Sequence, residues 1–307
     1  MAGYALGLAA VFAAALGAGK VVGGPEPVPP AAAHDGGGHG DTESGGAAAE
    51  VPGGLQVAEE GYRLAPVSGG LPVGRAAPFR FRIVGPDGEA VTDFTPTHDK
   101  ELHLIAVRRD LTGFQHLHPT MAADGTWSVP LAAGAPGQYR IFTDFRPAAR
   151  DKALTLGVDV SARGDYRPAP LPAPERTVTV DGYTVTLAGD LVPGTSSKLT
   201  LSVSAGGRPV TDLQPYLAAY GHLVALRDGD LAYLHVHPDG EPGDGRTAPG
   251  PEITFYAEVP SAGAYRLFLD FKHAGKVRTA AFTAVAGGAE LPPAPAAPGH
   301  DDGHANG

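Results

Sequence analysis

One stretch decides the fold: HLIAVRRDLTGFQHLHP, residues 103–119, which recurs as HLVALRDGDLAYLHVHP at residues 222–238. In each copy, an alternating apolar segment, a turn and a second short segment predict an antiparallel β-hairpin. Both copies keep the pattern His-x₁₂-His-x-His-Pro, although most residues between the histidines differ. A duplication that preserves three imidazoles indicates either chemistry or a demanding structural role for them.

The duplication extends well beyond the hairpins. GQYRIFTDF at 137–145 returns as GAYRLFLDF at 263–271, and the tripeptide VTD also occurs in both copies. Each copy holds about seven short alternating segments separated by turn signals such as PDG, ADG and RDG, which is the pattern of an immunoglobulin-like sandwich. Gly-x-Tyr before a strand, at Tyr139 and Tyr265, is typical of the tyrosine corner of such folds. The sequence therefore predicts an all-β protein with two tandem immunoglobulin-like β-sandwich domains.

The ends of the chain differ in character from the repeats. Residues 4–18 are apolar and uncharged, so we expect an N-terminal hydrophobic helix, an uncleaved anchor in preference to a cleaved signal, and hence export. The predicted organisation is a membrane anchor or signal segment at 1–23, a disordered linker at 24–54, β-sandwich repeat 1 at 55–162, a Pro-rich linker at 163–175, β-sandwich repeat 2 at 176–287 and a disordered tail at 288–307.

Composition excludes several classes of function. The chain has 307 residues, no cysteine and two methionines, so disulfides, thiolate metal sites and cysteine nucleophiles are ruled out. The net charge of −10 argues against nucleic acid as a partner. A Gly-rich phosphate loop, a nucleophile elbow and an HExxH helix are all missing from the sequence, and we expect no enzymatic activity.

The predicted hairpins bring the conserved histidines onto one face. If Val107 pairs with Phe114, His103 lies opposite His118, and sliding by two residues places it opposite His116 instead; both registers leave the three imidazoles on the same face. In the second copy, we expect His222 to lie opposite His235. Three such imidazoles can supply an N₃ set for Cu²⁺ or Zn²⁺. The candidate metal ligands are His103, His116, His118, His222, His235 and His237.

Four further residues are secondary candidates. His98 in the first copy and His273 in the second are additional candidate ligands. Asp144 and Asp270 occupy matching positions, each four residues after an arginine. The default interpretation is an Arg–Asp interaction on the sheet surface, and the alternative is a carboxylate that orients a metal-binding imidazole from outside the ligand shell.

A structural role for the histidines stays open beside the metal-binding role. His103 and His222 begin strongly apolar strands, and both are then expected to be buried and hydrogen-bonded to backbone at the end of a hairpin. Duplication preserves packing residues as readily as ligands. The direction of the imidazole nitrogens distinguishes the two roles, because ligands converge on one point and structural histidines bond separately to backbone carbonyls.

The motif HLIAVRRDLTGFQHLHP, followed by DGTW and GQYRIFTDF, resembles one seen in exported or membrane-anchored bacterial proteins associated with heavy-metal handling, some with YtkA-like modules. The layout is more distantly similar to the copper-resistance CopC-like sandwiches. The resemblance covers roughly residues 60–285 and implies a compartment and a fold. This chain departs from the CopC-like pattern, in which a ligand lies near the mature N-terminus and some members have a Met-rich loop.

We therefore expect an extracytoplasmic divalent-metal-binding protein, membrane-anchored or secreted, with a three-His hairpin site in each repeat. Its role would be sequestration or delivery of Cu²⁺ or Zn²⁺. Its expected partners are the metal ion and, through the N-terminal segment, a membrane, with no nucleic acid. The alternative is a non-catalytic structural or interaction module of the cell envelope with structural histidines.

Overall fold

The computed structural model describes residues 51–288, and both sandwich repeats lie in one compact unit of it. Every regular element in this range is a β-strand, and no helix there is long and apolar enough to cross a membrane. The prediction of an all-β chain with two tandem immunoglobulin-like sandwiches is confirmed. The predicted N-terminal helix and most of both predicted disordered segments lie outside the described residues.

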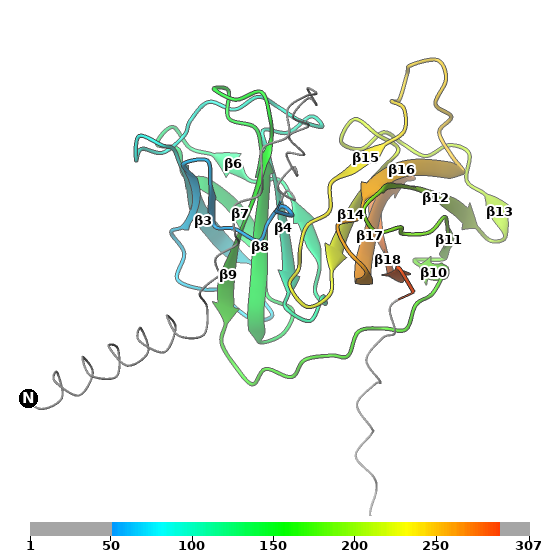
Figure 1. Ribbon diagram of the computed structural model, residues 1–307, viewed down its shortest axis with the longest axis horizontal. Helices are drawn as coiled ribbons and strands as arrows, with labels where there is room; N and C mark the ends of the chain where they lie inside the picture. The colour runs from blue at the N-terminus through cyan, green and yellow to red at the C-terminus, as the bar shows by residue number, and fades with distance from the viewer. Residues whose placement is uncertain (1–50, 289–307) are drawn as a thin grey trace, which may run out of the picture. The chain divides into compact units, whose positions relative to one another are not determined.

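The first repeat forms two sheets, an outer and an inner one (Figure 1). The outer sheet has the order β1 (Ala58–Glu59), β2 (Tyr62–Pro66), β3 (Ala77–Val84), β7 (Trp127–Leu131) and β6 (Thr120–Met121). The inner sheet has the order β5 (Gln115–Leu117), β4 (Leu102–Arg108), β8 (Gly137–Phe145) and β9 (Leu154–Ala162). All pairings in both sheets are antiparallel.

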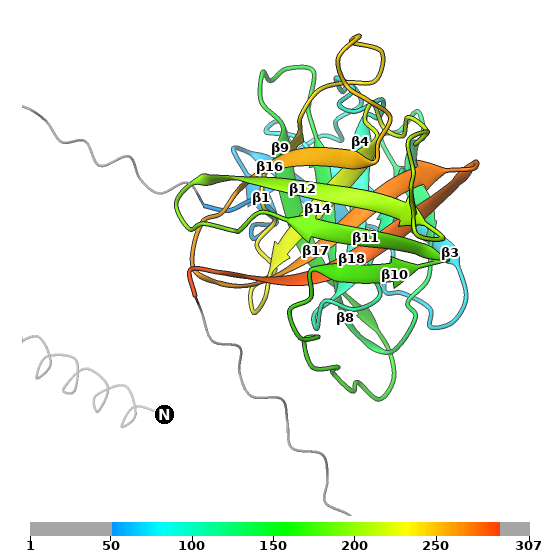
Figure 2. The same ribbon diagram turned by 90° about the vertical axis from the view of Figure 1, so that its right-hand side faces the viewer.

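The second repeat copies this plan, and Figure 2 shows its outer sheet in front of its inner sheet. The outer sheet has the order β10 (Thr177–Val180), β11 (Tyr183–Ala188), β12 (Ser196–Ala205), β16 (Glu252–Glu258) and β15 (Val236–Pro238), with β13 (Arg208–Pro209) paired to β12. The inner sheet has the order β14 (Gly221–Arg227), β17 (Gly263–His273) and β18 (Lys276–Ala286).

Each sandwich has its own apolar core and the predicted tyrosine corner. Alternate residues of the inner strands point into the core, as Tyr139 and Ile141 of β8 do. The Tyr139 hydroxyl donates to the carbonyl of Ala135 at 2.9 Å, and the Tyr265 hydroxyl donates to that of Ser261 at 2.7 Å. Both bonds run to backbone four residues upstream, so both repeats contain a tyrosine corner, as the Gly-x-Tyr motif predicts.

A third apolar cluster joins the two sandwiches through their inner sheets. On β4, Leu102, Leu104 and Ala106 belong to the core of the first sandwich, whereas Ile105 and Val107 point the other way, into the joining cluster. The second repeat mirrors this arrangement on β14. The cluster consists of Ile105, Val107, Leu111, Phe142, Val224, Leu226, Leu231 and Phe268. Every residue of β4 is buried because both of its faces are covered.

The Pro-rich linker and the start of the first repeat also contact the joined region. Ala169 in the linker donates its N–H to Asp110 at 2.8 Å, and Leu171 packs against the joining cluster. The N–H of Tyr233 in the second repeat donates to the carbonyl of Gly53 at 3.0 Å. Hydrogen bonds from the linker and from the start of the first repeat therefore add to the apolar contact between the two repeats.

We predict that Phe268→Ala destabilises the folded chain strongly. The Phe268 ring is 4% exposed and stacks on Phe114 with centroids 4.0 Å apart and an interplanar angle of 7°. Truncating a buried phenylalanine costs about 3–5 kcal/mol, which urea denaturation would measure. Val277→Ala, at a side chain that is 37% exposed, is the control and should change stability by less than about 0.5 kcal/mol. Equal effects of the two substitutions would contradict a packed contact between the sheets.

Candidate metal centre

The hairpin of β4 and β5 brings the three histidines of the first repeat together. Ile105 pairs with His116, and continuing this register sets His103 opposite His118. This is the first of the two predicted registers. His103 lies on the same face of β4 as Ile105 and Val107, which is the face toward the second sandwich. The cluster therefore lies where the inner sheets of the two repeats meet.

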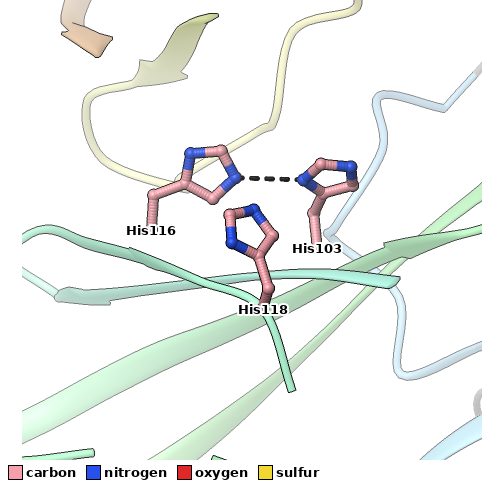
Figure 3. Close-up of side chains that lie close together, drawn as sticks. All are labelled: His103, His116 and His118. Atoms are coloured by element: carbon pink, nitrogen blue, oxygen red, sulfur yellow. Dashed lines mark hydrogen bonds between the residues drawn. The ribbon is translucent and has the colours of Figure 1, made fainter. Parts of the chain in front are cut away.

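The nitrogens of this triad converge (Figure 3). One ring nitrogen from each of His103, His116 and His118 lies within 4.8 Å of the other two. Nδ1 of His103 is 3.1 Å from Nε2 of His116, and the ring centre of His118 is 5.1 Å from that of His103 and 4.9 Å from that of His116. Nε2 of His118 is buried and has no hydrogen-bond partner among the described residues.

Acceptors outside the triad determine which nitrogens carry protons. Nε2 of His103 lies 3.0 Å from the carbonyl oxygen of Thr97, and a carbonyl only accepts, so this nitrogen is protonated. Nδ1 of His116 lies 2.9 Å from a carboxylate oxygen of Asp270 and is protonated for the same reason. In neutral rings, the nitrogens that face each other across 3.1 Å, Nδ1 of His103 and Nε2 of His116, both present lone pairs.

Two facing lone pairs repel unless positive charge lies between them. A tetrahedral ion at about 2.0–2.1 Å from each nitrogen separates its ligand nitrogens by roughly 3.3 Å, which is near the observed 3.1 Å. The partners Thr97 and Asp270 are the kind of outer contact that fixes the tautomer of a ligating histidine. The arrangement is therefore chemically suited to a divalent cation that prefers nitrogen.

Burial keeps the rings of His103, His118 and His222 neutral. Loss of water, with smaller contributions from neighbouring imidazoles, lowers the pKa of His103 to about 2, that of His118 to about 4 and that of His222 to about 3. A neutral imidazole is the form that binds a metal ion. The low pKa values therefore leave lone pairs available on all three rings near neutral pH.

The second repeat contributes a carboxylate to the triad of the first. Asp270, on β17, is 3% exposed, and it accepts from Thr279 at 2.5 Å as well as from His116. The default expectation of an Arg–Asp pair is wrong, because Arg266 donates to Thr283 instead. Asp270 has the geometry of the alternative, a carboxylate that orients an imidazole.

Asp144 occupies the matching position in the first repeat, where no histidine of the described residues 51–288 is hydrogen-bonded to it. It accepts from Thr155 at 2.9 Å, and burial raises its pKa. Arg140 does not pair with it: the guanidinium donates to Asp159 and to the carbonyls of Gly54 and Leu55. The Arg–Asp expectation is therefore wrong in both repeats, and of the two aspartates only Asp270 is hydrogen-bonded to the triad within the described residues.

The second histidine triad does not converge as the first does. Leu226 bridges Tyr233 in the register of the first copy, but β15 then pairs with β16 in the outer sheet, with His237 opposite Tyr256. The prediction that His222 lies opposite His235 is therefore wrong. The chain leaves the inner sheet earlier here than in the first copy, where the crossing follows His118.

The histidines of the second copy are divided between two places. The rings of His235 and His237, both exposed, lie 4.0 Å apart at 88°. His222 lies with the first triad instead, with its ring centre 5.8 Å from that of His103 and 5.7 Å from that of His116. The arrangement brings four of the six predicted ligands into one cluster.

The two additional candidate ligands, His98 and His273, also lie in different places. The exposed ring of His98 lies 4.9 Å from that of His222, at the edge of the cluster. His273 is elsewhere, with Nδ1 at 2.7 Å from the Tyr183 hydroxyl and Nε2 at 3.0 Å from Asp212. Both of its ring nitrogens have partners outside the cluster.

Sequence reasoning missed the residues that hold the imidazoles from outside. These are the carbonyls of Thr97 and Leu217, together with Tyr216, whose ring centre is 6.2 Å from that of His118. Backbone carbonyls leave no mark in a sequence. The apolar run on both faces of LHLIAVR was, however, a signal that this sheet is covered on each side.

Comparisons with known proteins identify a family. The model of a family described as Domain of unknown function (DUF8832) matches residues 56–163 and 178–288. This is not one of the heavy-metal-associated families that the resemblance suggested. A comparison with curated proteins finds no match.

Three similar solved structures share low identity with this chain. Invasin, a bacterial integrin-binding protein, is 12% identical with a TM-score of 0.22, over 75% of this chain and 41% of its own. A putative membrane anchored protein from Corynebacterium diphtheriae is 9% identical with a TM-score of 0.22, over 76% and 60%. Domains 4–9 of the surface layer protein SbsC are 12% identical with a TM-score of 0.21, over 73% and 31%. These distant similarities carry nothing about function.

We predict that the stability of the chain falls as the pH drops below about 6.5. An unfolded histidine has a pKa near 6.5, whereas burial holds the pKa values of His103, His118 and His222 well below it. Below pH 6.5 the unfolded chain therefore binds protons that the folded chain does not bind, and the free energy of unfolding decreases. Urea denaturation between about pH 7.5 and 5, with a chelator present, measures this slope.

A variant with both His103→Gln and His222→Gln provides the comparison for this slope. It should lose the larger part of the pH dependence, whatever its stability at neutral pH. A wild type whose stability is constant over this range would contradict the burial of neutral imidazoles.

Proposed function

We propose that this chain, which belongs to the DUF8832 family of domains of unknown function, binds a borderline divalent ion, Cu²⁺ or Zn²⁺, through His103, His116 and His118. Its role is sequestration or delivery of the ion, without catalysis. We place this role outside the cytoplasm because of the apolar segment at 4–18, which lies outside the described residues.

The proposal rests on the 3.1 Å distance between Nδ1 of His103 and Nε2 of His116. The proton of each ring is on its other nitrogen, which donates to an acceptor outside the triad. A ligand set of imidazoles alone favours borderline ions and disfavours Mg²⁺ or Ca²⁺, which prefer oxygen. Asp270 adds a negative charge beside the ligand shell, and this charge stabilises a bound cation. The three residues would therefore form a site for a nitrogen-preferring dication.

The alternative function is a structural module in which the histidines join the two sandwiches. The hydrogen bond from His116 to Asp270 favours it, because both side chains are 4% exposed and belong to different repeats. In this alternative a proton, rather than a metal ion, lies between His103 and His116, and Asp270 balances its charge. Metal titration distinguishes the two functions.

We predict that His116→Ala abolishes tight binding of Cu²⁺ and Zn²⁺. Wild type should be stabilised by metal through mass action, by about 2.7 kcal/mol when the free ion is at 100 times its Kd. Calorimetric titration and thermal unfolding with each ion measure binding and stabilisation. His273→Ala should behave as wild type, because both nitrogens of His273 are bonded elsewhere.

Wild type, His116→Ala and His273→Ala all keep the histidines outside residues 51–288. Weak metal binding by those histidines is therefore the same in the three proteins and does not affect the difference between them. A wild type that gains no stability with either ion, or a His116→Ala variant that binds as tightly as wild type, supports the structural alternative.

We predict that Asp270→Asn weakens metal binding without removing it. Asparagine keeps the shape of the side chain but loses the charge that fixes the His116 tautomer. Loss of such an outer partner typically costs about 10–100-fold in metal affinity. Asp212→Asn is the matched control, because Asp212 bonds to His273 outside the cluster and its loss should leave affinity unchanged. Equal affinities of the two variants would count against a positioning role for Asp270.

A further inference from the structure

His222 reaches the triad of the first repeat from the second sandwich. It is the counterpart of His103 in the duplicated motif and is the second residue of β14, on the face that carries Val224 and Leu226. Because that face meets β4, the ring of His222 lies almost parallel to that of His103, at 22° and 5.8 Å. The packing of the two inner sheets therefore sets a fourth imidazole beside the three.

The proton of His222 is fixed in the same way as that of His103. Nε2 of His222 lies 3.1 Å from the carbonyl oxygen of Leu217 and must donate to it. Nδ1 of the neutral ring therefore has a lone pair, and no hydrogen bond to it occurs among the described residues. This unprotonated ring nitrogen lies close to three other imidazoles and is able to coordinate a cation.

The other histidines near the cluster are less suited to be a fourth ligand. His98 is exposed on a loop, whereas His222 lies in β14 and is partly buried. His235 directly precedes β15 and His237 lies within it, in the outer sheet, and both are exposed. His222, which is partly buried, is the imidazole of the second repeat on the face toward the first.

We propose that Nδ1 of His222 is the fourth ligand of the ion held by His103, His116 and His118, so that the ion bridges the two sandwiches. This inference rests on the proposed function. The triad alone has its nitrogens within 4.8 Å of one another, so coordination requires the His222 ring to move toward the ion. A small rotation of that ring, or a small closure of the inner sheets, supplies this movement.

A set of four neutral imidazoles narrows the chemistry of the site. Zn²⁺ with four protein ligands is tetrahedral and has no open position for water, which is the arrangement of a binding site and not of a hydrolytic one. Cu²⁺ with four nitrogens prefers a tetragonal arrangement. Either ion keeps its full double charge against neutral ligands, and Asp270 is the nearby anion that offsets part of it.

Electron paramagnetic resonance of the Cu²⁺-loaded full chain tests this inference directly. The spectrum reports how many imidazole nitrogens bind the ion, and we expect four in wild type and three in His222→Phe. Phenylalanine keeps a flat ring to pack on His103 but has no nitrogen. His222→Gln is the second variant, in case the larger ring disturbs folding, and it should also show three.

Affinity gives an independent readout. Removing a direct ligand should cost at least as much as removing an outer partner, roughly 100-fold in Kd. His273→Ala, in the same repeat, should keep four nitrogens and wild-type affinity. Competition with a chelator of known affinity measures each Kd for Cu²⁺ and Zn²⁺.

The outcomes separate this inference from the proposed function. If wild type binds neither ion, the proposed function fails and the inference fails with it. If wild type binds through three nitrogens and both His222 variants bind with unchanged affinity, the inference is overturned and the triad site stands. Four nitrogens in wild type, reduced to three in the His222 variants, support the bridging ion.

Discussion

The apolar contact between the two inner sheets is the constraint on which the candidate site depends. Side chains alternate along a strand, so once Ile105 and Val107 of β4 pack against the second sandwich, His103 must face the same way. Val224 and Leu226 impose the same direction on His222. The imidazoles meet because apolar residues two and four positions farther along the same strands meet.

The duplication is symmetric in sequence but the site built from it is not. His116 and His235 are counterparts, yet the first is buried and bonded to Asp270, whereas the second is exposed on the way to the outer sheet. Asp144, the counterpart of Asp270, is bonded to Thr155 alone among the described residues. An earlier crossing between sheets in the second copy is enough to separate its histidines. One repeat then supplies the triad, and the other supplies its outer support.

The fold and the local hairpin could be predicted from the sequence, and the composite nature of the site could not. The alternation in LHLIAVR and the turn before Phe114 allow two registers, and both place His103, His116 and His118 on one face; the structure has the first of them. The alternation and the turn are local properties. The partnership of His116 with Asp270 depends on how two domains pack, which no short-range pattern encodes. In the second copy the chain leaves the inner sheet after Tyr233 and forms β15 in the outer sheet. This crossing likewise depends on which of the two sheets pairs more favourably with the segment.

A site made from both repeats links ion binding to the contact between them. If an ion binds more tightly when the sandwiches are docked, docking must become more favourable by the same free energy when the ion is bound. His116 and Asp270 are joined across the contact, so separating the sandwiches removes the outer partner of a ligand even where the triad stays intact. Release of the ion and loosening of the inner sheets would then favour each other. In the proposed delivery role, a partner that competes for the inner sheet of one repeat would therefore also weaken the binding of the metal.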